Sequence, residues 1–192
     1  MPFLIAFSLV SILIALAYLL IVLDSLFCGN SLATSAAARK QVLQLIAKYR
    51  PAAKNLYDLG CAYGDFALAL NRELPRLQVI AVDNNRLRIA LAKIKKRLMN
   101  SPVNFHKENL FQINLKSAEI VYTYLPRALM PRLEEKLLAE LPAGAVVITN
   151  STYFPLWRPA EMLCLDDDRQ KSAPIFVYVK VKKMFAETAD IS

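Results

Sequence analysis

The sequence predicts an α/β domain on a largely parallel β-sheet, closed by an antiparallel hairpin and preceded by one long apolar helix. Short apolar segments alternate with amphipathic helical segments from residue 55 to residue 150, which is the pattern of a parallel sheet with crossover helices. A glycine-containing turn joins the first strand to the helix after it. Two further apolar runs, 162–165 and 175–182, supply the closing hairpin.

The N-terminal segment has no charged residue from Pro2 to Leu23. At ~1.5 Å per residue, such a helix spans roughly 33 Å, enough to cross a hydrocarbon core of ~30 Å. We therefore predict a transmembrane anchor over residues 1–24, a linker over 25–36 and a catalytic domain over 37–192. A secretory signal peptide is the alternative, with a cleavage site among the small residues 33–38. It fits less well, because no basic residue precedes the apolar run, which exceeds the usual ~7–15 residues.

The charge pattern predicts which side of the membrane the domain occupies. The residues before the apolar run carry no basic side chain, whereas Arg39, Lys40, Lys48 and Arg50 follow it. This asymmetry places the domain on the cytoplasmic side, or on the matrix side in a mitochondrion. The net charge is +8, and the first 38 residues carry only Asp24, so the positive charge lies in the domain. A basic domain tethered to a bilayer would be drawn to anionic lipid headgroups, with nucleic acid as the competing partner. A lysine-rich solvated surface without a specific partner is the preferred interpretation of the charge alone.

Cysteine and histidine residues are too few and too scattered to suggest a metal site. Cys28, Cys61 and Cys164 form no Cys-x-x-Cys pair, so neither a disulfide framework nor a zinc site is expected. His106 is the single histidine. It is the one candidate for a histidine-based triad, but a structural role in the sheet is preferred.

A helix is predicted over 36–49, ahead of the first strand. Its apolar positions Val42, Leu43, Leu45 and Ile46 recur at near-helical spacing, and Pro51 ends it.

The stretch from residue 55 to residue 66 predicts a strand, a tight turn and a helix. The strand runs to Asp58, Gly60 and Gly64 lie in the turn, and an apolar helix follows from residue 64 to 73. Glycines let the backbone approach a ligand closely, and the N-terminus of the helix directs free N–H groups towards it. The turn suits a nucleotide-like ligand. The alternative is a strand-to-helix turn that holds no ligand.

A second strand over 77–82 ends at Asp83. A carboxylate at this position accepts two hydroxyl donors at once, as a ribose offers. Its alternative role is to cap the next helix. That helix, 85–98, is strongly basic, and we expect a buried apolar stripe formed by Leu87, Ala90, Leu91, Ile94 and Leu98.

The later elements complete the sheet. Strands are predicted over 103–106 and 118–122, a helix over 128–141, and a further strand after the turn at Gly144, up to residue 150. The helix that would usually join the fifth and sixth strands is shortened or lost. The polar residues 166–171 are interpreted as the solvated turn of the hairpin.

The first motif resembles that of class I S-adenosylmethionine methyltransferases, Asp-x-Gly-x-Gly-x-Gly. Here it comprises Asp58, Gly60, Ala62 and Gly64, with alanine replacing the middle glycine. The resemblance implies a Rossmann-like sheet and S-adenosyl-L-methionine as the cofactor. It also implies an adenine contact after the third strand, at Asn109 and Leu110, with Glu108 as the nearby alternative. The implied cofactor-binding residues are Asp58, Gly60, Cys61, Ala62, Tyr63, Gly64, Asp83, Asn84, Asn109, Leu110 and Tyr122.

Within that class the chain resembles the membrane-anchored protein-lysine N-methyltransferases of mitochondria and their bacterial relatives. The resemblance rests on residues 122–126 and 131–137, the Pro-Ala-Gly turn at 142–144 and Trp157-Arg158-Pro159. It implies a lysine of a membrane-associated protein as the acceptor. Tyr122 and Tyr124 are then the catalytic candidates, lining the mouth around the acceptor nitrogen. The alternative is that these phenols pack at a strand end.

Two other functions remain open from the sequence. One is methylation of a lipid or small molecule at the membrane surface. The other is a non-catalytic, S-adenosylmethionine-binding interaction module, for which Ala62 in the glycine turn is modest support.

Overall fold

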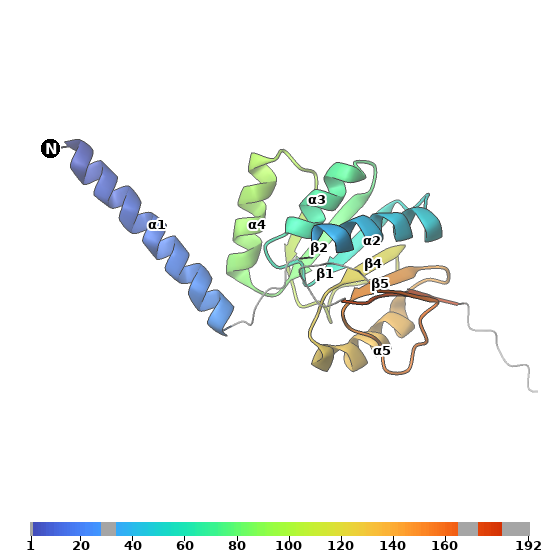
Figure 1. Ribbon diagram of the computed structural model, residues 1–192. Coiled ribbons are helices and arrows are strands. Elements are labelled where there is room, and N and C mark those ends of the chain that lie inside the picture. The colour runs from blue at the N-terminus through green and yellow to red at the C-terminus, as the bar shows by residue number, and fades with distance from the viewer. Residues whose placement is uncertain (1, 28–33, 165–172, 182–192) are drawn as a thin grey trace, which may run out of the picture. The chain divides into compact units, whose positions relative to one another are not determined.

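The computed structural model describes residues 2–27, 34–164 and 173–181, and the chain divides into two compact units, residues 1–32 and 33–192 (Figure 1). The first unit contains helix α1 (Pro2–Phe27). Its exposed side chains include Phe3, Leu4, Phe7 and Leu13. Among the described residues, no helix combines the length and the apolar character that a membrane crossing requires. The transmembrane anchor predicted for residues 1–24 is therefore unsupported by the structure.

The second unit is built on a seven-stranded sheet with the strand order β3-β2-β1-β4-β5-β7-β6. The first five strands are parallel to one another, and β7 runs antiparallel to both β5 and β6. The strands are β1 (Asn55–Leu59), β2 (Gln78–Asp83), β3 (Asn104–Lys107), β4 (Ile120–Thr123), β5 (Val146–Asn150), β6 (Glu161–Leu163) and β7 (Ile175–Val179).

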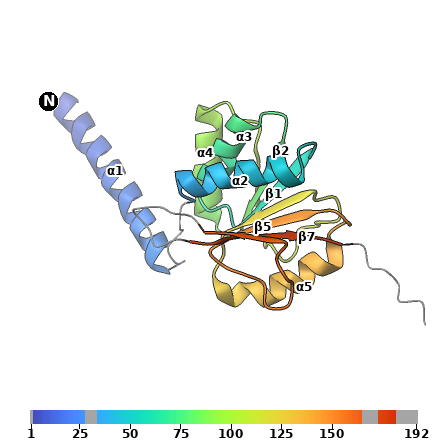
Figure 2. The same ribbon diagram turned by 45° about the vertical axis from the view of Figure 1, so that its right-hand side comes forward.

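Helices cover both faces of this sheet, as Figure 2 shows, with α2, α3 and α4 on one face and α5 on the other. The helices are α2 (Ala36–Tyr49), α3 (Asp65–Glu73), α4 (Arg86–Leu98) and α5 (Met130–Glu140), the last preceded by the short 3-10 turn η1 (Arg127–Leu129). Successive side chains of a strand point to opposite faces of the sheet, so alternate strand residues belong to two separate apolar clusters. Leu56 packs with α2 and α3, whereas Leu59 packs with Leu133 of α5.

The order of elements predicted for the domain is confirmed from α2 to β7. Residues 151–160 contain no helix, so the helix expected to be shortened or lost between β5 and β6 is indeed missing. The chain instead reaches the edge strand β6 directly and returns through β7 between β5 and β6. The predicted turn at residues 166–171 lies outside the described residues.

The predicted buried stripe of the basic helix is wrong. Helix α4 turns Arg88, Ile89 and Ala92 into the domain, whereas Ile94 and Leu98 are exposed. Ala92 packs closely against the turn that precedes α3, since its Cβ lies 3.1 Å from the position a Cβ would take at Gly64. Ile89 and the small Ala92, rather than Ile94 and Leu98, therefore face the interior of the domain.

Candidate functional site

The turn after β1 is built on three residues with left-handed backbone. Gly60, Ala62 and Gly64 have φ values of 86°, 47° and 77°. Glycine adopts this conformation without strain, but alanine adopts it rarely. The substitution of alanine for the middle glycine thus stores backbone strain at the site.

Side chains of the protein already occupy the space beside both glycines. A Cβ at Gly60 would lie 2.6 Å from Cδ2 of Leu125, and one at Gly64 would lie 2.6 Å from the ring of Phe105. The glycines are therefore required by the backbone conformation and by close packing within the domain. The sequence alone instead predicts that these glycines allow close approach of the backbone to a ligand.

Asp58 is the most unusual group in this part of the fold. It is 2% exposed, and its Oδ2 atom is buried without a hydrogen-bond partner among the described residues. Burial, reinforced by the nearby charge of Asp83, raises the pKa of Asp58 to about 8. An unpaired buried carboxylate is costly, so this atom is suited to a donor group brought by a ligand.

Asp83 holds the turn and the next helix together at the end of β2. One carboxylate oxygen accepts from the Ala62 backbone N–H at 3.0 Å, and the other accepts from Asn85 N–H at 2.8 Å. The N-cap of α4 is Asn85, whose side chain accepts from Leu87 and Arg88. The capping alternative for Asp83 is therefore not what the structure shows. Each of its oxygens retains a lone pair for a further donor.

Tyr122 lies inside the domain rather than at an open mouth. It is 1% exposed, its ring stacks on Phe66 at 3.9 Å, and it is paired with Asp58 across β1 and β4. Its hydroxyl lies 2.8 Å from Oγ1 of Thr34 and accepts from the Asn150 side-chain amide at 3.4 Å. Burial raises the pKa of this phenol, which keeps Tyr122 protonated at neutral pH.

Tyr124 is the more accessible of the two predicted catalytic tyrosines. It is partly buried against the apolar cluster that contains Phe66 and Tyr122, at the carboxyl end of β4. In an open parallel sheet, ligands bind beyond these ends. The packing role and the predicted acceptor role are thus both open to Tyr124, whereas Tyr122 is committed to internal hydrogen bonds.

The other predicted residues of the turn differ in environment. Cys61 is buried, and burial raises the pKa of its thiol, so it is not a thiolate at neutral pH. Tyr63 is half-buried, with Arg88 and Lys95 of α4 5.8 Å and 5.6 Å from its ring centre. Asn84 is exposed directly after Asp83 and is accessible to a ligand.

The loop after β3 is joined to the same edge of the sheet. Glu108 N–H donates to the Asp83 carbonyl at 3.0 Å. Asn109 is exposed and uses its side-chain oxygen to accept from Phe111 N–H at 3.0 Å, and Leu110 packs against the apolar cluster below the sheet. The amide N–H groups of Asn109 thus remain available as donors and suit a ring nitrogen. Its side-chain oxygen accepts one hydrogen bond and keeps a second lone pair.

Two residues that the sequence reasoning missed complete the edge. Asn150 ends β5, is 3% exposed and contacts Tyr122. Thr34 reaches the same hydroxyl from a position 88 residues earlier in the chain. Asn150 could have been found from its place at the carboxyl end of a parallel strand, but nothing in the local sequence marks Thr34.

These residues fit S-adenosyl-L-methionine. The orphaned oxygen of Asp58 can accept from a donor on the cofactor, and Asp83 retains acceptor capacity for ribose hydroxyls. The helix α3 begins directly after Gly64, with its N-terminus at this turn. The sheet order and this edge define a methyltransferase of the class I fold.

Solved structures agree on the fold. An RNA methyltransferase from Salinibacter ruber in complex with S-adenosyl-L-homocysteine has a TM-score of 0.70 at 18% identity, covering 80% of this chain and 96% of that one. The N-methyltransferase NodS from Bradyrhizobium japonicum has a TM-score of 0.59 at 13% identity, covering 75% and 94%. At these identities the likeness establishes the fold alone.

The model of the ANTKMT methyltransferase domain matches residues 58–161, more than half of the chain, and the chain belongs to this family. It is thus an S-adenosylmethionine-dependent methyltransferase. A protein-lysine N-methyltransferase of Saccharolobus islandicus is 27% identical over 126 residues, 65% of this chain and 78% of that protein. The adenine nucleotide translocase lysine N-methyltransferase of Mus musculus is 27% identical over 135 residues, 69% of this chain but only 58% of that protein.

Proposed function

We propose that this chain transfers a methyl group from S-adenosyl-L-methionine to the side-chain amine of a lysine in a protein. The observation that carries the proposal is its membership of the ANTKMT methyltransferase domain family together with two relatives named as lysine N-methyltransferases. The polar edge formed by Asp58, Asp83 and the end of β4 supports it.

Asp58, Asp83 and the turn between β1 and α3 would hold the cofactor, which supplies an activated methyl group when bound. The role of the chain is then to align the acceptor and to keep water out. Leu125 lies against the turn at Gly60, and Phe66 and Tyr122 stack beneath the edge. These apolar groups lower the local dielectric.

The acceptor amine must lose its proton before it can attack, because an ammonium has no free electron pair. An enclosed, partly apolar site disfavours the charged form of a lysine and lowers its pKa. The partly buried Tyr124 is the aromatic group at the end of β4 best placed to contact the acceptor. The phenol of Tyr122 contributes indirectly, by fixing Thr34 and Asn150.

The proposal is tested by mass spectrometry of methylated proteins from cells with and without this chain. The expected result is at least one methyl-lysine that disappears without the chain and returns with the wild-type sequence but not with Asp83→Ala. The purified chain with labelled S-adenosyl-L-methionine should then label the same protein. Label found only in extracted lipid or small molecules would contradict the lysine acceptor.

We further propose that the chain is attached to a membrane through its N-terminal apolar segment and acts on a membrane-associated protein. The support is the uncharged run from Pro2 to Leu23 and the basic residues that follow it, which favour a cytoplasmic or matrix location for the domain. In membrane fractionation, we expect the full-length chain to stay in the membrane fraction during extraction with high salt and with alkaline carbonate. Release by high salt would contradict attachment through the apolar segment.

A further inference from the structure

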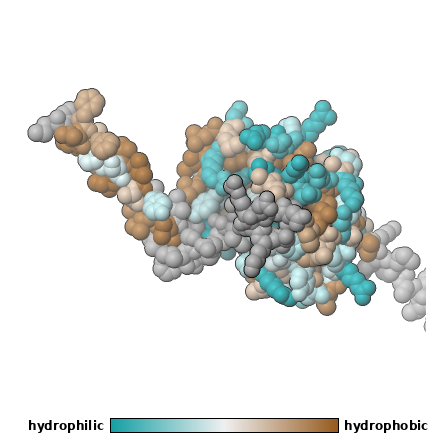
Figure 3. Space-filling view, viewed as in Figure 1, coloured by the Kyte–Doolittle hydropathy of each residue, from teal (hydrophilic) through white to brown (hydrophobic). Residues whose placement is uncertain are grey.

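Helix α4 presents a surface that the methyl-transfer site does not use. Its apolar part is unusually open, since Ile94, Leu98 and the next residue, Met99, are 55%, 82% and 50% exposed. Figure 3 shows the hydrophobic colour over the outer side of α4. Clustered exposed apolar side chains mark interaction sites on soluble domains. We call this surface the α4 face; it comprises Lys93, Ile94, Lys96, Arg97, Leu98 and Met99.

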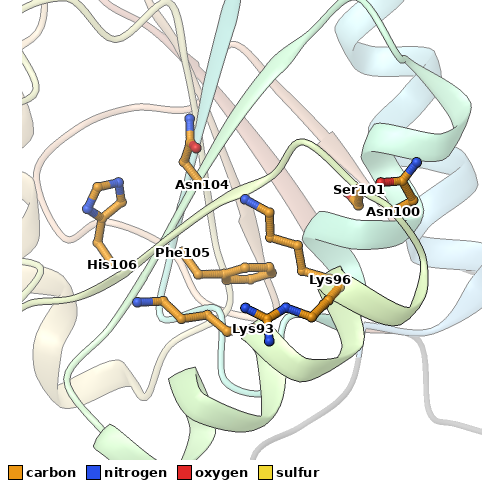
Figure 4. Close-up of a pocket in the computed structure, with 8 residues that line it drawn as sticks. Lys93, Lys96, Asn100, Ser101, Asn104, Phe105 and His106 are labelled. Carbon is orange, nitrogen blue, oxygen red and sulfur yellow. The ribbon is translucent and has the colours of Figure 1, made fainter.

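Next to the apolar side chains lies a cationic hollow. A cavity of about 420 Å³ lies between α4 and β3, and its lining includes Lys93, Lys96 and Arg97 of α4 and Asn104 and Phe105 of β3. Figure 4 shows Lys93 and Lys96 extending from α4 towards the strand that carries Asn104 and Phe105. No carboxylate among the described residues lines this cavity, so it is suited to an anion.

The hollow and the apolar side chains form one continuous surface. A second cavity of about 250 Å³ is lined by Lys93, Ile94, Arg97 and Leu98. It shares Lys93 and Arg97 with the first cavity. These two residues are four apart and thus lie on one side of the helix, between the anion hollow and the exposed leucine.

The positive charge of this surface is not neutralised within the part of the chain that the structure describes. Helix α4 contains no acidic residue. Its Lys95 pairs with Asp65 at 2.6 Å, but Lys93, Lys96 and Arg97 form no ion pair with a described residue. Basic side chains beside exposed apolar ones are the pattern of a helix that lies in a membrane interface.

We propose that the α4 face binds the surface of a bilayer that contains anionic phospholipids. The cavity between α4 and β3 takes the phosphate of a headgroup, and Ile94, Leu98 and Met99 enter the boundary with the acyl chains. The face would hold the catalytic domain against the membrane. The proposal builds on the membrane attachment proposed above, which supplies the bilayer but not this contact.

The first test compares binding of the full chain to vesicles of phosphatidylcholine alone and to vesicles with 30% phosphatidylserine. Each basic residue at an anionic surface contributes about fivefold in affinity. The variant K93Q/K96Q/R97Q should thus lose about 100-fold of its preference for the anionic vesicles. The matched control K54Q/R76Q/K116Q removes the same charge from exposed positions ahead of β1, β2 and β4 and should change the preference less than twofold.

The second test measures contact of the helix with the bilayer. With acyl chains brominated near the headgroup, the fluorescence of Leu98→Trp should be quenched beyond that of the wild-type chain, whose single tryptophan is Trp157. Leu138→Trp is the control, because Leu138 is 38% exposed but lies on α5, across the sheet. Equal quenching at the two positions would overturn the proposal.

The possible outcomes distinguish the contact of the α4 face with lipid from membrane attachment through the N-terminal segment. If the wild-type chain binds both kinds of vesicle equally, the α4 face has no lipid preference and the proposal fails, while attachment through α1 stands. If it binds neither, attachment fails as well. If the triple variant loses affinity for single-stranded RNA while it keeps its preference for anionic vesicles, the face is a nucleic-acid surface and the proposal is wrong.

Discussion

The polar groups at the two ends of the parallel strands differ in how completely they are hydrogen-bonded. At the amino ends, Asn55 donates to the Ser117 carbonyl at 3.0 Å and accepts from Glu119 N–H at 2.9 Å. Glu119 in turn accepts from Lys54 N–H at 3.1 Å and from Arg50 at 3.5 Å. These groups satisfy one another and tie neighbouring segments together.

At the carboxyl ends, the corresponding groups are more deeply buried and less completely paired. Asp58 has an oxygen without a partner among the described residues. The Asp83 carboxylate accepts from the backbone N–H groups of Ala62 and Asn85, and each oxygen keeps a further lone pair. Partly satisfied polar groups in a buried site cost stability. The amino ends thus tie the fold together, and the unsatisfied groups at the carboxyl ends support our proposal that the cofactor binds there.

The largest expected effect is at Asp83. Asp83→Ala removes the acceptor that we propose for the ribose hydroxyls. Each charge-assisted hydrogen bond is worth ~1.5–3 kcal/mol, so affinity for S-adenosyl-L-methionine should fall about 100-fold or more. Calorimetric titration measures it. Glu119→Gln, at the other end of the strands, should leave the affinity within about twofold; an equal loss in both variants would remove the distinction between the two ends.

Asp58 provides a pH-dependent test of the same contrast. Its pKa is raised to about 8 in the folded domain, against ~3.9 in an unfolded chain. The folded state therefore binds the extra proton between these values, and stability falls as the pH rises through this window. Asp58→Asn lacks this penalty. Its Tm should exceed that of the wild type by an increasing margin from pH 4 to pH 8, reaching ~5 °C or more, and no further above pH 8. A constant margin across this range would contradict the raised pKa.

Substitutions of Tyr122 and Tyr124 should have different effects on the kinetics of methyl transfer. Tyr122→Phe removes the hydroxyl that contacts Thr34 and Asn150, so it should cost ~1 kcal/mol of stability and change kcat by less than about tenfold. Tyr124→Ala should lower kcat/KM for the protein acceptor by more, with little change in cofactor affinity. Unchanged kinetics for the Tyr124 variant would remove it from the acceptor site.

The smallest effect is expected at Ala62. Ala62→Gly relieves the left-handed strain at φ 47° but adds freedom to the unfolded chain. The net gain in stability should be no more than ~1 kcal/mol, with cofactor affinity changed less than about threefold. Thermal unfolding and titration check both values. A gain in affinity of about tenfold would show that the Cβ of Ala62 obstructs the ligand.

Local patterns predicted the fold well because they report on local structure. The glycine turn, the strand ending at Asp83 and the hairpin after β5 could all be predicted from the sequence, since each depends on residues close together in the chain. The stripe on α4 was predicted wrongly because helical spacing shows that apolar residues share a side, not that the sheet takes that side. On α4 the buried side is the one that carries Arg88, Ile89 and Ala92.

The sequence could predict candidate site residues near strand ends, but not contacts between residues that are distant in the chain. Asp58 was predicted from the first motif and Asp83 from the end of the second strand, and their role in cofactor binding stays a prediction. The contact of Tyr122 with Thr34 joins residues 88 apart, and the filling of the space beside Gly60 by Leu125 depends on how the loop after β4 folds back. Neither has a signal in the local sequence.

The central claim is that the carboxyl ends of β1 and β2 form the cofactor site, and proton release on binding tests it most directly. Titration of the wild-type chain with S-adenosyl-L-methionine at pH 7, in two buffers of different ionisation enthalpy, reports the protons exchanged. If the cofactor donates to Asp58, whose pKa is about 8 without a partner, binding should release close to one proton, and Asp58→Asn should release none. Binding with the same heat in both buffers, or an unchanged release in Asp58→Asn, would contradict the account.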